Sequence, residues 1–393
     1  MKIVQINATC GAGSTGKICV AVSKLLNERG VENYILYSSY QSDYENGIKY
    51  MSDKEIPLQA LKSRIFGNYG FNSKKATKRL ISKLKEISPD IIHLHNLHSH
   101  NVDLKMFFNY IKSQKIKLYW TFHDCWAFTG YCPHFFMTKC DKWQTACNEC
   151  PQKRVYSWFF DNSKKLYNAK KELFTNLDLT IITPSKWLGD LVKQSFLKEY
   201  PVKVINNGIN LNVFKPVQGD FRKRYNIENK KVVLGVAFDW GVRKGLDIVI
   251  ELSRRLPGDY QIVLVGTNDS VDKQLPGNII SIHRTQNQKE LAEIYSQANV
   301  LINPTREENY PTVNMEAIAC ATPVITFKTG GSPEILDEKT GSVVEIDDID
   351  AMEREIIRVC SNNPFDEQDF IERAKSFDEN EKFLEYLHLY GII

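Results

Sequence analysis

Short runs of apolar residues alternate with longer amphipathic stretches along most of the chain. The runs suit buried parallel strands, and the stretches between them have apolar residues at helical spacing. In the first half we predict a helix at Ile18–Arg29 and strands at Lys2–Asn7, Asn33–Tyr37, Ile91–Leu94, Leu118–Thr121 and Leu179–Thr183. Strands and helices that alternate in this way predict a doubly wound α/β layer.

The same alternation restarts after a segment rich in turn-forming residues, Asn206–Pro216. Here we predict strands at Val232–Val236, Gln261–Val265, Val300–Asn303 and Pro323–Thr326, and helices at Leu246–Arg255, Lys289–Ala298 and Val313–Cys320. We therefore expect two Rossmann-like domains, residues 1–208 and 209–376. A C-terminal helix in residues 377–393 is expected to pack back toward the first domain. Ligands bind at the carboxyl ends of parallel strands, so we expect the site in a cleft between the domains.

The strongest chemical signal is the segment from Glu308 to Ala317, which follows one predicted strand and opens a helix. Backbone N–H groups at such a helix start can bind phosphate. The carboxylates of Glu308 and Glu316 can accept hydrogen bonds from sugar or ribose hydroxyls. A capping acid and a solvated helix glutamate would give the same pattern, so the segment alone leaves both interpretations open.

This segment resembles the motif of glycosyltransferase family 4, a family with the GT-B fold. In that motif two glutamates separated by seven residues precede a small-residue helix and a proline-led strand, and Ala319–Ile325 continues it here. Thr329–Glu334, Thr183–Trp187 and Asn206–Asn210 also resemble the family, in the expected order. The resemblance covers essentially the whole chain. It implies two Rossmann-like domains facing a central cleft, the C-terminal one binding the nucleotide sugar.

The family pattern implies a role for each matching residue. Glu308 would contact hydroxyls of the transferred sugar, and Glu316 would hold the ribose. Lys244 would neutralise the departing diphosphate, because a cation there stabilises developing negative charge. The backbone around four residues would meet the diphosphate: Tyr310, Pro311, Thr312 and Val313. Family members commonly have an Arg shortly before the lysine, whereas Gly235–Trp240 has none, so either Arg243 or a cation from elsewhere replaces it.

The glycine-rich segment Gly11–Lys17 superficially matches a P-loop, but Ile18 follows where a Mg²⁺-binding Ser or Thr is needed. We therefore do not expect an ATPase. The segment resembles the family's first glycine-rich turn, in which Gly13 and Gly16 would let the backbone approach donor phosphate and acceptor. A plain strand-to-helix turn is the alternative.

Histidines follow two of the predicted strands of the first half. His123 comes directly after the strand Leu118–Thr121 and resembles the family's histidine that contacts the donor sugar at the reacting centre. A structural role is the alternative for a lone histidine. Four more lie at the end of the strand Ile91–Leu94, around Asn96: His93, His95, His98 and His100. They lack a neighbouring carboxylate pair, so we assign them to the acceptor side of the cleft rather than to a metal.

Five of the nine cysteines lie in a Cys-rich insert, residues 125–151. Four thiolates from a short, loop-rich segment suit structural zinc. The candidate ligands are Cys132, Cys140, Cys147 and Cys150, and His134 is an alternative ligand. Small buried cysteines are the alternative, and stable disulfides are not expected in a cytoplasmic protein. The resemblance implies metal-independent transfer, so we expect no catalytic metal.

Charge is unevenly distributed. Residues 1–210 contain 30 Lys and Arg against 17 Asp and Glu, whereas the rest contains 21 against 30. This predicts an anionic partner for the first half: anionic lipid, phosphate or nucleic acid. We favour an anionic membrane surface or lipid-diphosphate acceptor, contacted by the basic amphipathic stretch Ser73–Lys85, and no nucleic acid. An ordinary solvated face is the alternative.

The N-terminal segment Met1–Asn7 has one Lys, a very short apolar run and no small-residue cleavage site, which is not typical of a signal peptide. No window approaches the ~20 apolar residues of a transmembrane helix. We therefore expect a cytoplasmic protein, peripheral on the inner face of the cell membrane.

These observations lead to one functional hypothesis. We expect a hexosyltransferase that moves a sugar, with retention, from a nucleotide-diphosphate sugar, UDP being the favoured nucleotide. The expected acceptor is a lipid-linked saccharide in the synthesis of capsule, exopolysaccharide or O-antigen. Retention follows from the family, and the leaving phosphate would take the acceptor proton in a same-face mechanism. The alternatives are a GT-B-fold sugar-nucleotide epimerase or hydrolase, and a non-catalytic nucleotide-binding protein.

Overall fold

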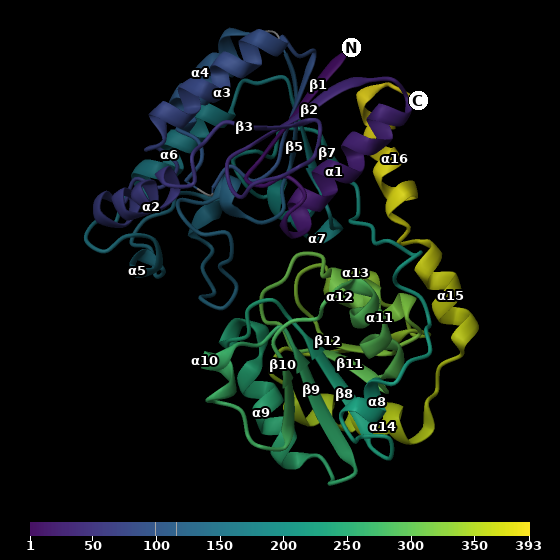
Figure 1. The fold of residues 1–393 in the computed structure, drawn as a ribbon. Helices are drawn as coiled ribbons and strands as arrows, with labels where there is room; N and C mark the ends of the chain where they lie inside the picture. Colours follow the sequence, from purple (N-terminus) through teal and green to yellow (C-terminus); the bar gives the residue numbers. More distant parts are fainter. Residues whose placement is uncertain (99, 115) are drawn as a thin grey trace. The chain divides into compact units, whose positions relative to one another are not determined.

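The computed structural model describes residues 1–98, 100–114 and 116–393, which form two compact units (Figure 1). The first unit consists of residues 1–206 and 383–393, and the second consists of residues 207–382. Each unit contains one parallel sheet with helices between most successive strands. The predicted two-domain α/β architecture is therefore confirmed.

The sheet of the first unit is built from apolar strands whose central members are buried on both faces. Its strands lie in the order β3 (Gly47–Lys49), β2 (Glu32–Tyr37), β1 (Lys2–Asn7), β4 (Ile91–Leu94), β5 (Lys117–Thr121), β6 (Leu179–Thr183) and β7 (Val202–Val204). The helices are α1 (Gly13–Glu28), α2 (Glu55–Phe66), α3 (Lys74–Ile87), α4 (Leu104–Ser113), α5 (Lys153–Tyr156), α6 (Ser163–Phe174) and α7 (Lys186–Val192). The strand order reverses between β1 and β4.

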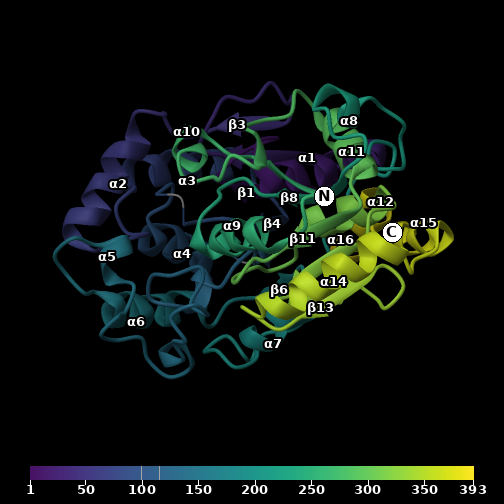
Figure 2. The same ribbon diagram turned by 90° about the horizontal axis from the view of Figure 1, so that it is seen from below.

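The second unit repeats this plan with a smaller sheet. Its strands lie in the order β10 (Ile279–Ile282), β9 (Tyr260–Val265), β8 (Lys231–Val236), β11 (Val300–Asn303), β12 (Val324–Phe327) and β13 (Gly341–Val344). The helices are α8 (Phe221–Arg224), η3 (Val242–Lys244), α9 (Leu246–Arg255), α10 (Asp269–Asp272), α11 (Gln288–Gln297), α12 (Thr312–Ala319), α13 (Ser332–Ile335), α14 (Ile349–Asn362) and α15 (Glu367–Lys375). The long α14 packs along β11, β12 and β13 (Figure 2). Strand order here reverses between β8 and β11.

The C-terminal helix α16 (Glu379–Tyr390) supplies apolar side chains to the core of the first unit. Phe383, Tyr386 and Tyr390 are buried there in one cluster with residues of β1, β5 and β6. The hydroxyl of Tyr119 also donates a hydrogen bond of 2.7 Å to the Leu389 carbonyl. The last residues of the chain therefore complete the first sheet's packing.

Two features of the elements differ from the sequence-based expectation. The first helix begins at Gly13 instead of Ile18, so Gly13 and Gly16 lie in its first turn and not in a loop. Four strands of three or four residues were missed, and each of them lies at an edge of its sheet: β3, β7, β10 and β13. Among the described residues, no helix has both the length and the apolar character that crossing a bilayer requires.

Candidate functional site

The carboxyl ends of β8 and β11 are neighbours at the point where the second sheet reverses its strand order. Ligands of doubly wound sheets bind at this position. The segment after β8 contains Lys244, and the loop after β11 contains Glu308. Lys244 Nζ lies 2.6 Å from Glu308 Oε2. The fold therefore brings together two charged residues that are 64 positions apart in the sequence.

The surroundings of this ion pair keep the Glu308 side chain ionised at neutral pH. The side chains of Lys244 and Glu308 are only 17% and 21% exposed. Burial alone would raise the pKa of Glu308, but the charge and hydrogen bond of Lys244, the N–H of Asn309 and the charge of Arg243 together lower it below its ordinary value. Glu308 is therefore a carboxylate at neutral pH, able to accept hydrogen bonds from hydroxyls but not to donate one.

Arg306 holds the two loops together. Its guanidinium donates two hydrogen bonds to the carboxylate of Asp247, at 2.8 and 2.7 Å, and a third to Asp347 at 2.7 Å. Its backbone N–H donates to the carbonyl of Arg243 at 2.9 Å. Paired donors in fixed geometry give a rigid link. The Arg243 guanidinium in turn donates to the carbonyl of Glu307 at 3.3 Å, so it lies beside the Glu308 loop.

A third loop, after β12, approaches the Glu308 loop through a glycine. Gly330 has a φ of +55°, and a Cβ placed on it would overlap the carbonyl oxygen of Glu308. The N–H of Gly331 donates to the Asn309 carbonyl at 2.7 Å, and the Thr329 hydroxyl donates to the Arg306 carbonyl at 2.9 Å. Glycine is required at position 330 because the backbone conformation and the close approach both exclude a side chain.

The helix α12 follows the Glu308 loop directly. Its positive N-terminal end is suited to an anion, and its N-cap, Pro311, supplies no side-chain hydrogen bond. Proline also lacks an N–H, so backbone donation to a diphosphate can come from Tyr310, Thr312 and Val313 but not from Pro311. Glu316 lies one turn further along α12 and accepts a 3.0 Å hydrogen bond from the Tyr295 hydroxyl. Burial raises the pKa of Tyr310 to about 12, so its hydroxyl stays protonated.

In the first unit, the glycine-rich turn after β1 forms the start of α1. The N–H of Gly11 donates to the carbonyl of Gly16 at 3.0 Å, and the Thr9 hydroxyl donates to the carbonyl of Ala12 at 2.6 Å. Gly13 has a φ of +66°, and a Cβ on Gly16 would crowd the Thr9 hydroxyl. Both glycines are thus explained by local geometry at a strand end that faces the switch point of the first sheet.

His123 and His95 follow the neighbouring strands β5 and β4 and contact each other. His123 Nε2 lies 3.1 Å from His95 Nδ1, and His95 Nε2 lies 3.3 Å from Gln5 Oε1. The amide nitrogen of Gln5 donates to the Cys19 carbonyl, so its oxygen faces His95 and accepts. His95 therefore has its proton on Nε2, and its Nδ1 accepts the Nε2–H of His123.

The pKa values of both imidazoles support this neutral chain. Burial lowers the pKa of His123 to about 4, although the charge of Asp124 acts in the opposite direction. Burial, followed by the charges of His93 and His123, lowers the pKa of His95 well below its ordinary value. At neutral pH, His123 is therefore an uncharged side chain in a fixed orientation.

The assignment of His93 and His95 to a cleft surface is wrong. Both are buried, and His93 bonds the hydroxyls of Thr121 and Tyr390 within the core. Their polar groups are satisfied inside the unit. His98 and His100 are partly exposed, and His98 Nε2 lies 2.9 Å from the Asp124 carboxylate.

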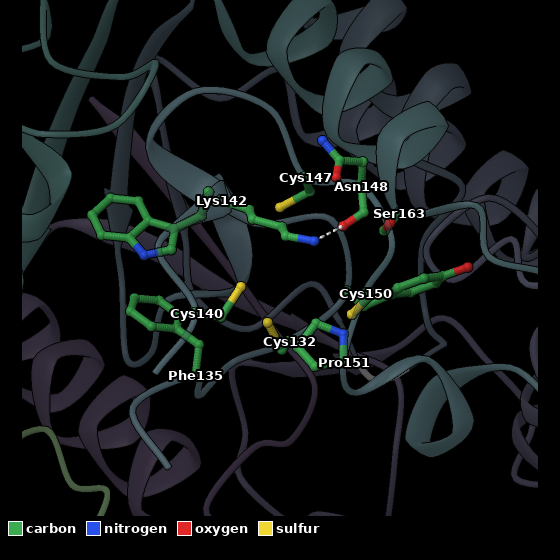
Figure 3. Close-up of a pocket in the computed structure, with 11 residues that line it drawn as sticks. Cys132, Phe135, Cys140, Lys142, Cys147, Asn148, Cys150, Pro151 and Ser163 are labelled. Atoms are coloured by element: carbon green, nitrogen blue, oxygen red, sulfur yellow. Dashed lines mark hydrogen bonds between the residues drawn. The ribbon is translucent and has the colours of Figure 1, made fainter. Parts of the chain in front are cut away.

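The four predicted zinc ligands line one small cavity in the first unit: Cys132, Cys140, Cys147 and Cys150 (Figure 3). All nine cysteines are free thiols. Burial raises the pKa of Cys132 to about 12 and that of Cys147 to about 11. Among the described His, Cys, Asp and Glu residues, the one group of three or more whose ligand atoms all lie within 4.8 Å of one another is Asp269, Asp272 and His283. The four sulfurs are therefore spread more widely than that.

Comparison with known families agrees with the two-unit division of the chain. Residues 16–213 match glycosyltransferase family 4, and residues 217–377 match the glycosyl transferases group 1. The chain is a member of glycosyltransferase family 4. It is therefore a glycosyltransferase, which confirms the enzyme class expected from the sequence motifs.

Two curated relatives can be aligned with most of the chain. The putative colanic acid biosynthesis glycosyl transferase WcaC of Escherichia coli K12 is 24% identical over 366 residues, covering 89% of this chain and 88% of WcaC. The sulfoquinovosyl transferase SQD2 of Arabidopsis thaliana is 22% identical over 345 residues, covering 80% of this chain and 62% of SQD2. The chain is thus related to enzymes of polysaccharide biosynthesis.

Solved structures confirm the GT-B fold. Sucrose-phosphate synthase from Thermosynechococcus elongatus superposes with a TM-score of 0.74 at 18% identity, covering 100% of this chain and 98% of that one. Anabaena HepE, crystallised in complex with UDP, superposes with a TM-score of 0.70 at 14% identity over 100% of both chains.

Several residues of the candidate site were not found from the sequence. Arg306 was not found because it acts between loops that only the folded sheet brings together. Gly330 lies in the family-like loop Thr329–Glu334, but its close approach to Glu308 was not predicted. The contact between His95 and His123 did have a signal, since each histidine follows a predicted strand at the carboxyl end. Parallel neighbours in the sheet place such residues close together.

Proposed function

We propose that this enzyme transfers a hexose, with retention, from a UDP-sugar to a lipid-linked saccharide during the synthesis of a surface polysaccharide. The observation that carries this proposal is the Lys244–Glu308 pair at the switch point of the second sheet. An ammonium and a carboxylate side by side suit a donor with two unlike ends, an anionic diphosphate and a sugar rich in hydroxyls. The UDP complex of the similarly folded HepE supports UDP as the nucleotide.

Binding of the donor would exchange partners within the pair. The Lys244 ammonium would leave Glu308 for the diphosphate, where it offsets the charge that develops as the glycosidic bond to phosphate breaks. Glu308, released from its cation, would accept hydrogen bonds from the hydroxyls of the sugar. The N-terminus of α12 and the guanidinium of Arg243 add positive potential beside the diphosphate.

Two further residues fit this donor. Glu316 accepts from Tyr295 and is held in α12, a position from which it would bind the ribose hydroxyls. In the first unit, His123 would accept a hydrogen bond from a sugar hydroxyl through Nδ1 as a neutral imidazole, because its Nε2–H is donated to His95 and burial lowers its pKa. The acceptor proton would pass to the leaving phosphate oxygen on the same face of the sugar. No metal is assigned a step in this reaction.

A transfer assay tests the proposal directly. The purified enzyme is incubated with radiolabelled UDP-hexoses and a lipid extract of bacterial membranes, and label in the lipid phase is measured. We expect transfer by the wild type, a loss of about 100-fold in Glu308→Gln, and full activity in Glu345→Gln, an exposed glutamate of the same unit. Rapid release of free sugar with no label in any acceptor would instead identify a hydrolase or epimerase, and donor binding without turnover would identify a binding protein.

We also propose that the enzyme acts at the cytoplasmic face of the membrane. The apolar face of α3 is buried in the core of the first unit, so the basic stretch predicted as a membrane contact offers only its cationic face. Exposed apolar side chains occur instead in α2, in α5 and in the segment that follows α5. They are Leu58, Leu61, Phe66, Val155, Trp158, Phe159 and Phe160.

These two segments are joined, because the N–H of Trp158 donates to the Arg64 carbonyl at 2.7 Å and the Asn162 side-chain amide donates to the Phe66 carbonyl at 2.8 Å. Exposed cations lie among the apolar residues at Lys62, Arg64 and Arg154. Aromatic rings and basic groups on one surface are typical of proteins that bind anionic bilayers.

Flotation with liposomes that contain anionic lipid measures this contact. Replacing Trp158 and Phe159 by serine removes two rings, each worth about 1.5–3 kcal/mol when fully buried, so binding should weaken by about two to four orders of magnitude. Phe238→Ser is the matched control, since Phe238 is an exposed ring of the second unit. Equal flotation of all three proteins would refute the membrane surface.

A further inference from the structure

The segment between η1 (Trp126–Phe128) and α5 has little regular structure. Residues 129–152 contain one short 3₁₀ turn, η2 (Lys142–Gln144), and otherwise only turns and bends. Loops of this length inside a compact domain are uncommon unless something fixes them. The aromatic rings of Phe135 and Trp143 are nevertheless buried here. The segment therefore has a buried centre although it contains almost no helix or strand.

At this centre lies the cavity that the four cysteines line. Its volume is about 20 Å³, which is room for a single water-sized particle. Figure 3 shows the sulfur atoms of Cys132, Cys140, Cys147 and Cys150 directed toward this space from three sides. The cysteines come from separate stretches of the segment. The rest of the lining consists of Tyr131, Phe135, Trp143 and Pro151 together with the polar residues Lys142, Asn148 and Ser163.

Two contacts around the cavity suit negatively charged sulfur. The backbone N–H of Gly130 donates a hydrogen bond of 3.2 Å to Cys147 Sγ. The side chain of Lys170 is fully buried next to the segment. Its Nζ donates hydrogen bonds to the carbonyls of Trp126 and Thr129 at 2.8 and 3.0 Å. It also lies 3.6 Å from the centre of the Trp126 ring. Burial lowers the pKa of Lys170 to about 7, and the charges that act in the opposite direction are those of Cys147, Cys132 and Asp124. A buried cation is costly unless an anion lies nearby.

We propose that these four cysteines bind one structural zinc ion that holds the Cys-rich segment in place. The chemistry balances: four thiols give up four protons as the ion binds, and the resulting cluster has a net charge of −2. Lys170 and the Gly130 N–H offset part of that charge. Sulfurs around tetrahedral zinc are about 3.8 Å apart, so the ion would draw these four closer together than they are in the structure. None of these four cysteines is assigned a part in donor binding.

Metal analysis of the full-length protein, purified without a metal-affinity step, tests the site. We expect about one zinc ion per chain in the wild type. Cys140→Ser and Cys150→Ser should each lose most of the zinc, because each removes one of four ligands at a half-buried position. Cys360→Ser is the matched control, a half-buried cysteine of α14 that should retain the full amount.

Cobalt provides a second readout that does not depend on activity. The reduced, zinc-free protein loaded with Co²⁺ should give the intense visible bands and the sulfur-to-metal charge-transfer absorption of a tetrahedral thiolate site, and Cys150→Ser should weaken both. A wild type without zinc that also binds no added Zn²⁺ or Co²⁺ would overturn the proposal. So would fewer than nine reactive thiols in the unreduced, unfolded protein, which would reveal a disulfide. Loss of transfer with zinc retained would count against the proposed function alone.

Discussion

The close approach of Gly330 to the Glu308 loop makes Gly330→Ala an informative perturbation. The added methyl group meets two separate obstacles: a φ of +55°, and the carbonyl oxygen of Glu308. The backbone strain alone costs about 1–2 kcal/mol for alanine. To relieve the overlap, the two loops must separate by about 1 Å, and such overpacking typically costs a further 1–3 kcal/mol.

The sum, about 3 kcal/mol, is expected to lower the Tm by roughly 6–12 °C. Because Glu308 follows the displaced loop, we also expect kcat/KM for sugar transfer to fall by about 100-fold, the usual effect of a 1 Å misplacement in an active site. Differential scanning calorimetry measures the first quantity, and the transfer assay with the identified UDP-sugar measures the second.

Gly30→Ala separates strain from overlap. Gly30 has a φ of +68° at the end of α1, but a Cβ there meets nothing within 4 Å. This variant should lose about 1 kcal/mol and no activity. If Gly330→Ala matched Gly30→Ala in both Tm and kcat/KM, the argument that the β12 loop positions Glu308 would be refuted.

Three further predictions concern charges and histidines. Lys244→Met and Glu308→Gln should each destabilise the protein by about 2 kcal/mol and together by less than the sum, which urea unfolding in a double-mutant cycle measures. Burial lowers the folded-state pKa of His93 to about 3 and that of His123 to about 4, both below the unfolded value of 6.5, so stability is complete above pH 6.5 and declines below it. At pH 5 each histidine should cost about 2 kcal/mol, and His93→Gln should flatten the decline in Tm. His95→Phe, which removes the acceptor for the His123 N–H, should lower kcat about 10-fold with little change in the donor KM, and an unchanged kcat would exclude a positioning role.

Much of the fold could be predicted because buried parallel strands are short, continuous apolar runs. Lys2–Asn7 and Val300–Asn303 are strands with the predicted bounds. The edge strand β13 was missed, since three of its four residues are partly or fully exposed and the apolar run is weak. The early start of α1 was also missed, because two glycines in a first turn look like a loop.

The candidate site was only partly accessible to the sequence. The residue types and their places after strands pointed to Lys244 and Glu308, but their contact depends on which strands become neighbours. The role of Arg306 as a bridge between loops left no pattern in the chain, since its partners are Asp247 and Asp347. Long-range partners of this kind are set by topology, and local spacing does not encode them.

The most direct test of the central claim is a thermal-shift comparison of UDP, GDP, ADP and TDP with the wild type, Lys244→Ala and Glu316→Ala. A nucleotide present at 100 times its Kd stabilises the native state by about 2.7 kcal/mol. The account predicts that UDP alone raises the Tm of the wild type clearly and that both variants lose most of this shift. Variants that respond as the wild type does, or a wild type that responds to none of the four, would contradict a donor site at Lys244, Glu308 and Glu316.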